Sequence, residues 1–251
     1  MKIVVIGGTG RIGSRLVTSL KGLGHDATPA APETGVNSLT GEGLAEALAG
    51  ADVVVDVANS PSLEGDAALA FFEKAGRNLM AAKEAAGVRH HVALSIVGAD
   101  RLPASGYLRA KVTQEALIPA SKVPYTILRS TQFFPFIDGI IHDGSADGEI
   151  RLSPALMQPI DLADVVAALA DVVAGAPANR TIEIGGPEAI AITRFAEQYL
   201  SAKGDPRPVV ADPDAPYFGA RLDERSLVPG PDAWLGPTTL ADWLRATIPA
   251  D

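Results

Sequence analysis

Residues 5–13 read Val5-Ile6-Gly7-Gly8-Thr9-Gly10-Arg11-Ile12-Gly13, and they directly follow the short apolar run Ile3-Val4. The apolar residues are too few for a helix and predict a buried strand, whereas the amphipathic stretch Ile12–Gly22 predicts a helix. Glycine permits a tight turn between the two and lets another group approach the backbone closely. Because the N–H groups at a helix start attract anions, this order of elements predicts a turn that binds a diphosphate.

Glycine-rich turns also connect strands to helices in proteins that bind nothing there. The binding interpretation is favoured because the turn comes straight after the first strand and a βαβ pattern follows it. We therefore predict a dinucleotide site at Gly7, Gly8, Thr9, Gly10, Arg11, Ile12 and Gly13.

The composition of the chain narrows the possible classes of protein. Its 251 residues, 47% of them hydrophobic, suit one α/β domain with a sizeable core. No run of about eighteen uncharged apolar residues occurs, so we expect no membrane span. The first strand begins at Lys2, which leaves no room for a signal peptide, and we expect a cytoplasmic protein. The net charge of −9 argues against nucleic acid as a partner.

The chain also lacks the patterns of several catalytic classes. It contains no cysteine, which excludes disulfides, thiolate metal sites and cysteine nucleophiles. His90 and His91 are adjacent in a predicted strand, so their side chains point to opposite faces and cannot chelate one metal ion. We predict no metal site. The absence of a Gly-x-Ser-x-Gly stretch argues against an α/β serine hydrolase.

Strands and helices alternate over the first half of the chain. We expect strands at Lys2–Ile6, His25–Ala31, Asp52–Val57, His90–Val97 and Tyr125–Ser130, and helices at Ile12–Gly22, Gly41–Ala49, Asp66–Ala86 and Tyr107–Ala120. This alternation predicts an α/β fold, a Rossmann-like doubly wound parallel sheet with helices on both faces.

The alternation becomes less regular after residue 130. We expect a helix at Leu162–Val173, a strand at Arg180–Ile184, and helices at Thr193–Ala202 and Pro237–Ile248. Residues 205–236 are rich in proline and glycine and predict surface loops around short elements. Ligands of open α/β sheets bind outside the carboxyl ends of the strands, so these late segments are expected to cap that region.

A second pattern, Tyr-x-x-x-Lys, places Tyr107 and Lys111 on one face of a predicted helix. A nearby lysine cation favours tyrosinate, so we expect Lys111 to lower the pKa of Tyr107 from its ordinary value of about 10. Such a tyrosine exchanges a proton with a carbonyl or alcohol oxygen during hydride transfer, while the lysine holds the nicotinamide ribose. Chance also produces this spacing on many helices. Here, however, the pair follows the fourth predicted strand of a chain that carries the glycine turn.

Ser95 lies near the end of that fourth strand, in Leu94-Ser95-Ile96-Val97-Gly98. This position places a hydroxyl at the carboxyl edge of the sheet, where a substrate is expected. We therefore predict that Ser95 holds the substrate oxygen, although small residues also end strands without a chemical role.

At this point the chain resembles the short-chain dehydrogenase/reductase superfamily, specifically its atypical, NmrA-like NAD(P)-binding branch. The resemblance rests on residues 7–13, 94–98, 107–111, 124–129 and 159–165. It implies one NAD(P)-binding Rossmann-like domain over residues 1–251. Within this domain, residues 1–130 are the cofactor-binding core, and the mixed segment 131–251 is a small C-terminal part that contributes the substrate cleft.

The resemblance also implies roles for single residues. Asn59, after the third strand, falls on the adenosine and ribose side of the cofactor site, although a turn-forming asparagine is the alternative. Tyr107 and Lys111 match the catalytic pair of the superfamily, and Ser95 lies closer to Tyr107 than the usual serine. Four residues after the fifth strand resemble the substrate-side loop, with hydrophobic packing as the alternative: Thr131, Gln132, Phe133 and Phe134.

Two side chains bear on the choice between NAD(H) and NADP(H). An acid at the end of the second strand would hold the ribose 2′-hydroxyl and exclude a 2′-phosphate, and none lies at that point. Glu33 comes slightly later, and Pro32 directs it into the loop. Arg11, within the glycine turn, is placed to meet a 2′-phosphate, although it also suits a solvated surface. The sequence therefore favours NADP(H).

The sequence thus predicts an NAD(P)H-dependent oxidoreductase that transfers a hydride between nicotinamide and a small, apolar carbonyl, quinone or enone. The alternative is a non-catalytic, NAD(P)-sensing NmrA-like regulatory protein, against which the Tyr-x-x-x-Lys pair argues. A third possibility is an epimerase that recycles its cofactor, although such enzymes usually have longer chains. The sequence does not indicate an oligomeric state.

Overall fold

The computed structural model describes residues 1–248, and its main feature is a seven-stranded sheet in the order β12-β9-β5-β4-β3-β1-β2. The strands are β1 (Lys2–Ile6), β2 (Asp26–Ala30), β3 (Val53–Asp56), β4 (His90–Ile96), β5 (Tyr125–Ser130), β9 (Arg180–Gly185) and β12 (Trp234–Leu235). The pairs β1–β2, β1–β3, β3–β4 and β9–β12 are parallel. This strand order, with β4 in the centre, confirms the predicted Rossmann-like fold.

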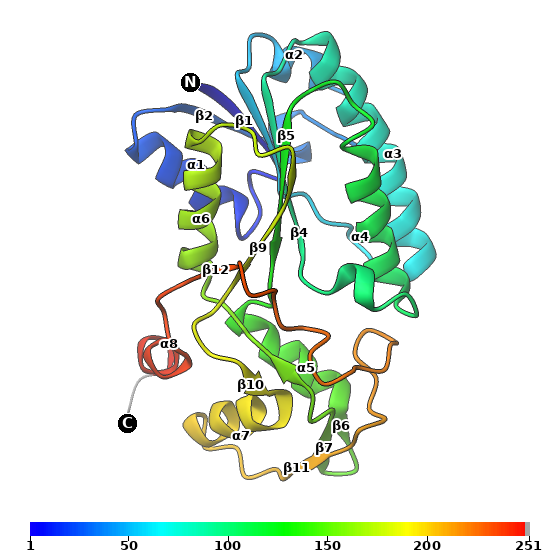
Figure 1. Ribbon diagram of the computed structural model, residues 1–251, viewed down its shortest axis with the longest axis vertical. Helices are drawn as coiled ribbons and strands as arrows, with labels where there is room; N and C mark the ends of the chain where they lie inside the picture. Colours follow the sequence, from blue (N-terminus) through cyan, green and yellow to red (C-terminus); the bar gives the residue numbers. More distant parts are fainter. Residues whose placement is uncertain (249–251) are drawn as a thin grey trace. The chain divides into compact units, whose positions relative to one another are not determined.

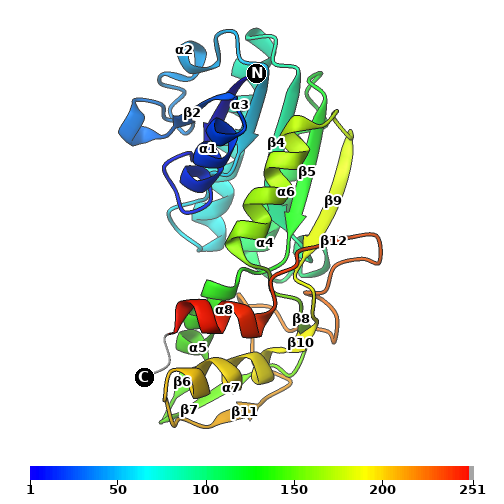
Figure 2. The same ribbon diagram turned by 90° about the vertical axis from the view of Figure 1, so that its left-hand side faces the viewer.

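Helices cover both faces of this sheet. They are α1 (Gly13–Gly22), α2 (Leu44–Leu48), α3 (Gly65–Ala85), α4 (Gly106–Leu117) and α6 (Leu162–Ala174). Figures 1 and 2 show α3 and α4 on one face and α1 and α6 on the other. In the first 130 residues, the predicted strands and helices end within three residues of the observed ones. The predicted layer arrangement is therefore confirmed.

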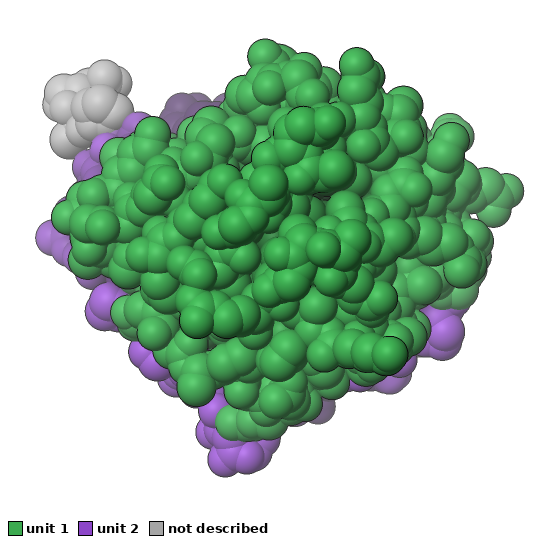
Figure 3. Space-filling view, turned by 90° about the horizontal axis from the view of Figure 1, so that it is seen from above, with its two compact units in different colours: residues 1–95, 106–129, 165–182 green, residues 96–105, 130–164, 183–251 purple. Residues whose placement is uncertain are grey.

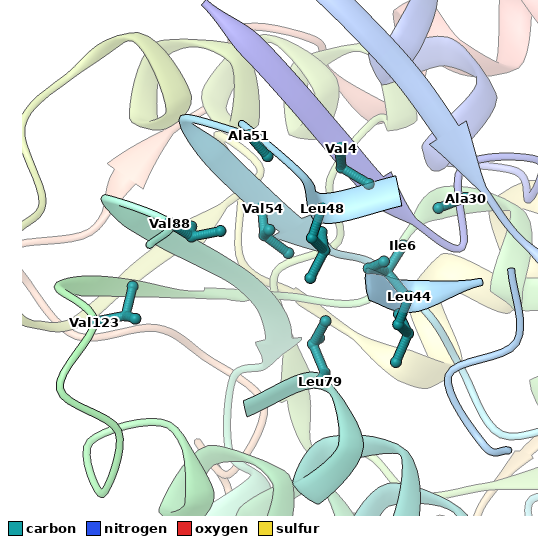
Figure 4. Close-up of a cluster of buried hydrophobic side chains, with 10 residues drawn as sticks. All are labelled: Val4, Ile6, Ala30, Leu44, Leu48, Ala51, Val54, Leu79, Val88 and Val123. Carbon is teal, nitrogen blue, oxygen red and sulfur yellow. The ribbon is translucent and has the colours of Figure 1, made fainter. Parts of the chain in front are cut away.

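The core between the sheet and its helices is built from β-branched and leucine side chains. Val4, Ile6 and Val54 project from β1 and β3 toward Leu48 of α2 and Leu79 of α3 (Figure 4). All five side chains are at most 3% exposed. Burial of each side chain of this size contributes about 1.5–3 kcal/mol, which holds the carboxyl ends of the strands in fixed positions.

The chain divides into two compact units, which Figure 3 shows in green and purple. Unit 1 consists of residues 1–95, 106–129 and 165–182, and unit 2 of residues 96–105, 130–164 and 183–251. The chain therefore passes from unit 1 to unit 2 at residue 130, among other points. The glycine turn, Ser95, Tyr107 and Lys111 belong to unit 1, whereas residues 131–134 belong to unit 2.

Unit 2 contains short elements around an aromatic core. They are a 3-10 helix (Phe134–Phe136), α5 (Ile137–Gly144), β6 (Ser145–Ala146), β7 (Glu149–Leu152), β8 (Leu156–Met157), β10 (Ile190–Ala191), α7 (Ile192–Ala202), β11 (Val209–Ala211) and α8 (Leu240–Thr247). Trp243 of α8 stacks on Phe134 and on Tyr199 of α7, with centroid distances of 5.2 and 5.8 Å. Figure 2 shows α5, α7 and α8 of this unit.

Part of the predicted surface loop over residues 205–236 is buried in unit 2. Leu227 is fully buried and Val228 is 3% exposed. The Arg101 guanidinium donates to the Val228 carbonyl at 2.7 Å and so fixes this segment. The expectation of surface loops is therefore wrong for these residues, because a contact 127 positions away in the sequence holds them inside.

Candidate cofactor and catalytic site

The glycine turn joins β1 to α1 and folds closely on itself. Gly7 has a φ of +77°, and a Cβ atom on it would lie 2.8 Å from Cα of Ala58. A Cβ atom on Gly13 would lie 2.2 Å from the Gly7 carbonyl oxygen. Only glycine fits these two positions, so the sequence requirement arises from the turn itself.

The start of α1 is suited to an anion. Ile12 occupies the N-cap position, and no side chain caps the helix there. Thr9, Gly10 and Arg11 are exposed in the same turn. An uncapped helix start offers backbone N–H groups and a partial positive charge. These residues therefore fit the diphosphate of a dinucleotide.

Glu33 lies beside the glycine turn. Its position in the sequence alone did not predict this contact. It belongs to the 3-10 helix Pro32–Thr34 that follows β2. Its Oε2 accepts a hydrogen bond of 3.3 Å from the Thr9 hydroxyl. Although Pro32 precedes it, Glu33 therefore turns toward the glycine turn, at the end of the second strand, where an acid can reach a ribose hydroxyl.

Tyr107, at the start of α4, is buried and hydrogen-bonded. Its hydroxyl donates to Oδ1 of Asn59 at 2.9 Å, and the Ser60 backbone N–H donates to the same oxygen at 2.9 Å. Burial raises the pKa of Tyr107, and the bond to Asn59 opposes the rise. The expectation that Lys111 lowers this pKa is therefore wrong in direction, because the loss of hydration dominates.

Lys111 is buried one turn further along α4 and is held by several groups. Its Nζ donates to the Leu94 carbonyl at 3.0 Å and to Oε1 of Gln114, and it lies 4.7 Å from the centroid of the Phe72 ring. Burial lowers the pKa of Lys111 to about 8, while the carboxylates of Asp56 and Glu115 oppose the shift. Its bond to Leu94 places the ammonium at the carboxyl end of β4.

Three predicted site residues contain buried polar atoms without a partner in residues 1–248. They are Ser95 Oγ in unit 1, and Thr131 Oγ1 and Gln132 Oε1 in unit 2. Buried polar atoms are normally hydrogen-bonded, so each of these is free to meet a ligand atom. Ser95 also follows Leu94, whose carbonyl binds Lys111.

The remaining two predicted substrate residues differ from each other. Phe134 is 1% exposed and stacks on Trp243, so its contacts are those of a core residue. Phe133 is half-buried and stacks on Phe136 at a centroid distance of 5.2 Å. The packing interpretation therefore fits Phe134 better than the substrate interpretation.

Sequence reasoning missed two buried polar side chains beneath this site. Asp56, the last residue of β3, and Gln114 of α4 are 6% and 5% exposed, and Gln114 Nε2 donates to Asp56 Oδ2 at 2.8 Å. An acid within the run Val53-Val54-Val55-Asp56 was the available signal. Within residues 1–248, no group of three or more His, Cys, Asp or Glu side chains is placed to hold a metal ion.

The fold and the glycine turn define a dinucleotide-binding protein of the Rossmann class. Residues 7–174 match the NAD(P)H-binding family, and the chain belongs to this family. It is 30% identical over 222 residues to a (4-alkanoyl-5-oxo-2,5-dihydrofuran-3-yl)methyl phosphate reductase of Streptomyces griseus. The alignment covers 81% of this chain and 74% of the relative.

Several solved structures with bound NAD share the fold. One of them is a short-chain dehydrogenase/reductase superfamily protein. A superfamily protein of Agrobacterium tumefaciens with bound NAD has a TM-score of 0.75 at 18% identity, with 98% of this chain and 95% of that chain covered. DesIV, a dTDP-glucose 4,6-dehydratase of Streptomyces venezuelae with NAD bound, has a TM-score of 0.76 at 19% identity, with coverage of 99% and 96%. A Thermus thermophilus UDP-glucose 4-epimerase complex with NAD has a TM-score of 0.75 at 17% identity, with coverage of 99% and 98%. These matches, each below 20% identity, show that the chain shares its fold with these NAD-bound proteins.

None of the helices within residues 1–248 combines the length and the apolar character needed to cross a lipid bilayer.

Proposed function

We propose that this protein is an NAD(P)H-dependent reductase in which Tyr107 donates the proton. The observation that carries the proposal is a chain of contacts within unit 1. Gly7 of the glycine turn lies against Ala58, and the next residue, Asn59, accepts the hydrogen bond of the Tyr107 hydroxyl. The predicted cofactor turn and the predicted proton donor are therefore separated by two adjacent residues.

The raised pKa of Tyr107 supports a role as an acid. A tyrosine that stays protonated at neutral pH can donate its hydroxyl proton to a substrate oxygen, whereas it is a poor base for the reverse reaction. The Lys111 ammonium is held at the carboxyl end of β4, where it can donate a hydrogen bond to the nicotinamide ribose. A bound nicotinamide supplies the hydride, so hydride and proton together reduce the substrate by two electrons.

We propose a small carbonyl, quinone or enone as the substrate. The name of the S. griseus relative describes a ring that carries an alkanoyl and an oxo group, which is a carbonyl substrate. The unpartnered Ser95 hydroxyl supports this class, because a hydroxyl can donate to a carbonyl oxygen.

The contact between Glu33 and Thr9 bears on the cofactor. The sequence favours NADP(H) because of Arg11, but a carboxylate beside the glycine turn repels a 2′-phosphate and accepts hydrogen bonds from ribose hydroxyls. We therefore propose NAD(H) as the preferred cofactor, with Glu33 as the residue that sets the preference.

The test is consumption of the reduced cofactor by the purified protein. We expect the protein to oxidise NADH continuously, in the presence of at least one member of a panel of quinones, enones and ketones, with reduced product in equal amount. Cofactor binding without consumption across the panel would contradict the reductase and leave the sensing protein or an epimerase. Chain length does not exclude an epimerase, because 98% of the T. thermophilus chain is covered. An epimerase, however, would show no net consumption.

A further inference from the structure

Asp56 is a buried carboxylate at the end of a strand that is otherwise valine. It is 6% exposed, and burial raises its pKa. A charge in such a place is costly unless hydrogen bonds satisfy it. Both of its oxygens are engaged, Oδ1 by the Ala58 N–H at 3.1 Å and Oδ2 by Gln114 Nε2 at 2.8 Å.

The bond to Gln114 leads to Lys111. The amide of Gln114 donates through Nε2 to Asp56 and accepts through Oε1 from the Lys111 ammonium. If the amide turned over, its oxygen would face the carboxylate and its NH₂ group would face the ammonium. Gln114 therefore has one orientation that satisfies both neighbours, and this orientation fixes the position of Nζ.

The bond to Ala58 leads to Tyr107. It closes the turn after β3, and the next residue in that turn is Asn59. Oδ1 of Asn59 accepts the hydrogen bond of the Tyr107 hydroxyl. Asp56 is therefore connected, through one side chain and through one backbone turn, to both members of the Tyr107–Lys111 pair on α4.

We propose that Asp56 and Gln114 are positioning residues that jointly hold the Lys111 ammonium and the Tyr107–Asn59 pair in their reactive places. The proposal rests on the proposed reductase function. An apolar pair would fill the same space without the cost of a buried charge, and mutual orientation of two reacting groups is a reason to keep the polar pair.

The chain offers a charge exchange as a test. In Asp56→Asn the amide NH₂ meets the NH₂ of Gln114, and in Gln114→Glu two carboxyl groups meet, so each single variant breaks the connection. In the double variant Asp56→Asn/Gln114→Glu, the asparagine can accept from Ala58 and donate to the new carboxylate, which accepts from Lys111. We expect kcat to fall about ten- to a hundredfold in each single variant and to recover to within about threefold of wild type in the double variant.

The pH dependence separates positioning from stability. Asp56→Asn removes a negative charge near Lys111 and lowers its pKa below about 8, whereas Gln114→Glu adds one and raises it. We expect the basic limb of the kcat profile to move in these opposite directions. Asn78→Ala is the matched control. It removes the bonds of Asn78 to the Ser38 and Leu39 carbonyls in the same unit, so we expect it to lower stability but leave the profile unchanged.

A second measurement distinguishes failure of the positioning role from failure of the proposed reductase function. The Lys111 signal, assigned by its loss in Lys111→Arg, can be titrated by NMR in ¹³C-lysine-labelled protein without cofactor. If the wild type shows no turnover but the pKa of Lys111 still moves in opposite directions in the two single variants, the reductase function is contradicted and the connection from Asp56 to Lys111 is supported. Two results would overturn the positioning role when the wild type shows turnover. In the first, the single variants have the same kcat and the same Lys111 titration as the wild type. In the second, the double variant has a kcat no higher than that of either single variant.

Discussion

Tyr107 and Tyr199 both precede a lysine by four positions, yet their surroundings differ. Lys203 Nζ donates to the Tyr199 hydroxyl at 2.8 Å, and that hydroxyl donates to Asp138 Oδ1 at 2.7 Å. Lys111 instead donates to a strand carbonyl and to Gln114. The sequence predicted the Tyr107–Lys111 pair from its spacing and its place after the fourth strand. Spacing alone does not indicate which group each side chain contacts, because burial and neighbouring elements determine that.

At the scale of single residues, Glu33→Gln tests the cofactor preference. Removing the carboxylate beside Thr9 removes its repulsion of a 2′-phosphate, so we expect the affinity for NADPH relative to NADH to rise about tenfold. Titration of the protein with each reduced dinucleotide by fluorescence measures the ratio. Glu46→Gln, which makes the same change of charge at an exposed position of α2, should leave it unaltered. An unchanged ratio in Glu33→Gln would rule out the role of Glu33.

Among the elements, the turn between β1 and α1 gives a stability prediction. Gly13→Ala places a methyl group 2.2 Å from the Gly7 carbonyl oxygen, so we expect the free energy of unfolding to fall by about 1–3 kcal/mol. Urea denaturation measures this difference. Gly22→Ala, at the other end of α1, meets nothing within 4 Å and should be neutral or stabilising by up to about 1 kcal/mol. Equal effects of the two variants would contradict the close folding of the turn.

Strand β4 gives a prediction for acid. Burial lowers the pKa of His90 from 6.5 to about 4, and it lowers the pKa of His91 in the same direction. As the pH falls below 6.5, the unfolded state takes up protons that the folded state does not, so stability is full above 6.5 and is lost toward pH 4. When the pH is lowered from 7 to 5, we expect His90 to lower the free energy of unfolding by about 2 kcal/mol.

His90→Gln should remove that part of the pH dependence, as measured by urea denaturation at the two pH values. His142→Gln changes an exposed histidine of α5 and serves as the control. If stability fell equally in wild type and in His90→Gln, the buried histidine would not be the cause.

The individual helices and strands also show which sequence patterns predict structure correctly. Most strands and helices up to Ser130 were predictable because they are regular apolar patterns followed within two residues by a glycine or proline, as after β1, α1, β4 and α4. Helix α5 and the two-residue strands of unit 2 were not predicted. Their local patterns are too short, and contacts such as that of Arg101 with Val228 hold the loops around them. Asp56 and Gln114 were missed for the same reason, since they lie 58 positions apart and meet only in the folded chain.

For the whole molecule, membership of the NAD(P)H-binding family and the parallel sheet establish what the glycine turn is suited to bind. The buried network of unit 1 is consistent with chemistry beside that turn, since it joins Tyr107 and Lys111 to the end of β3. The central claim is therefore that Tyr107 supplies the proton in a reduction by a nicotinamide cofactor.

One measurement tests that claim most directly: kcat of wild type, Tyr107→Phe and Tyr199→Phe on one substrate, with cofactor affinity determined on the same preparations. Tyr199 is the matched control, because it is also a buried tyrosine four positions before a lysine. We predict that Tyr107→Phe lowers kcat about 10²–10⁴-fold with cofactor affinity within about threefold of wild type, and that Tyr199→Phe leaves both unchanged. Wild-type turnover in Tyr107→Phe would contradict the account.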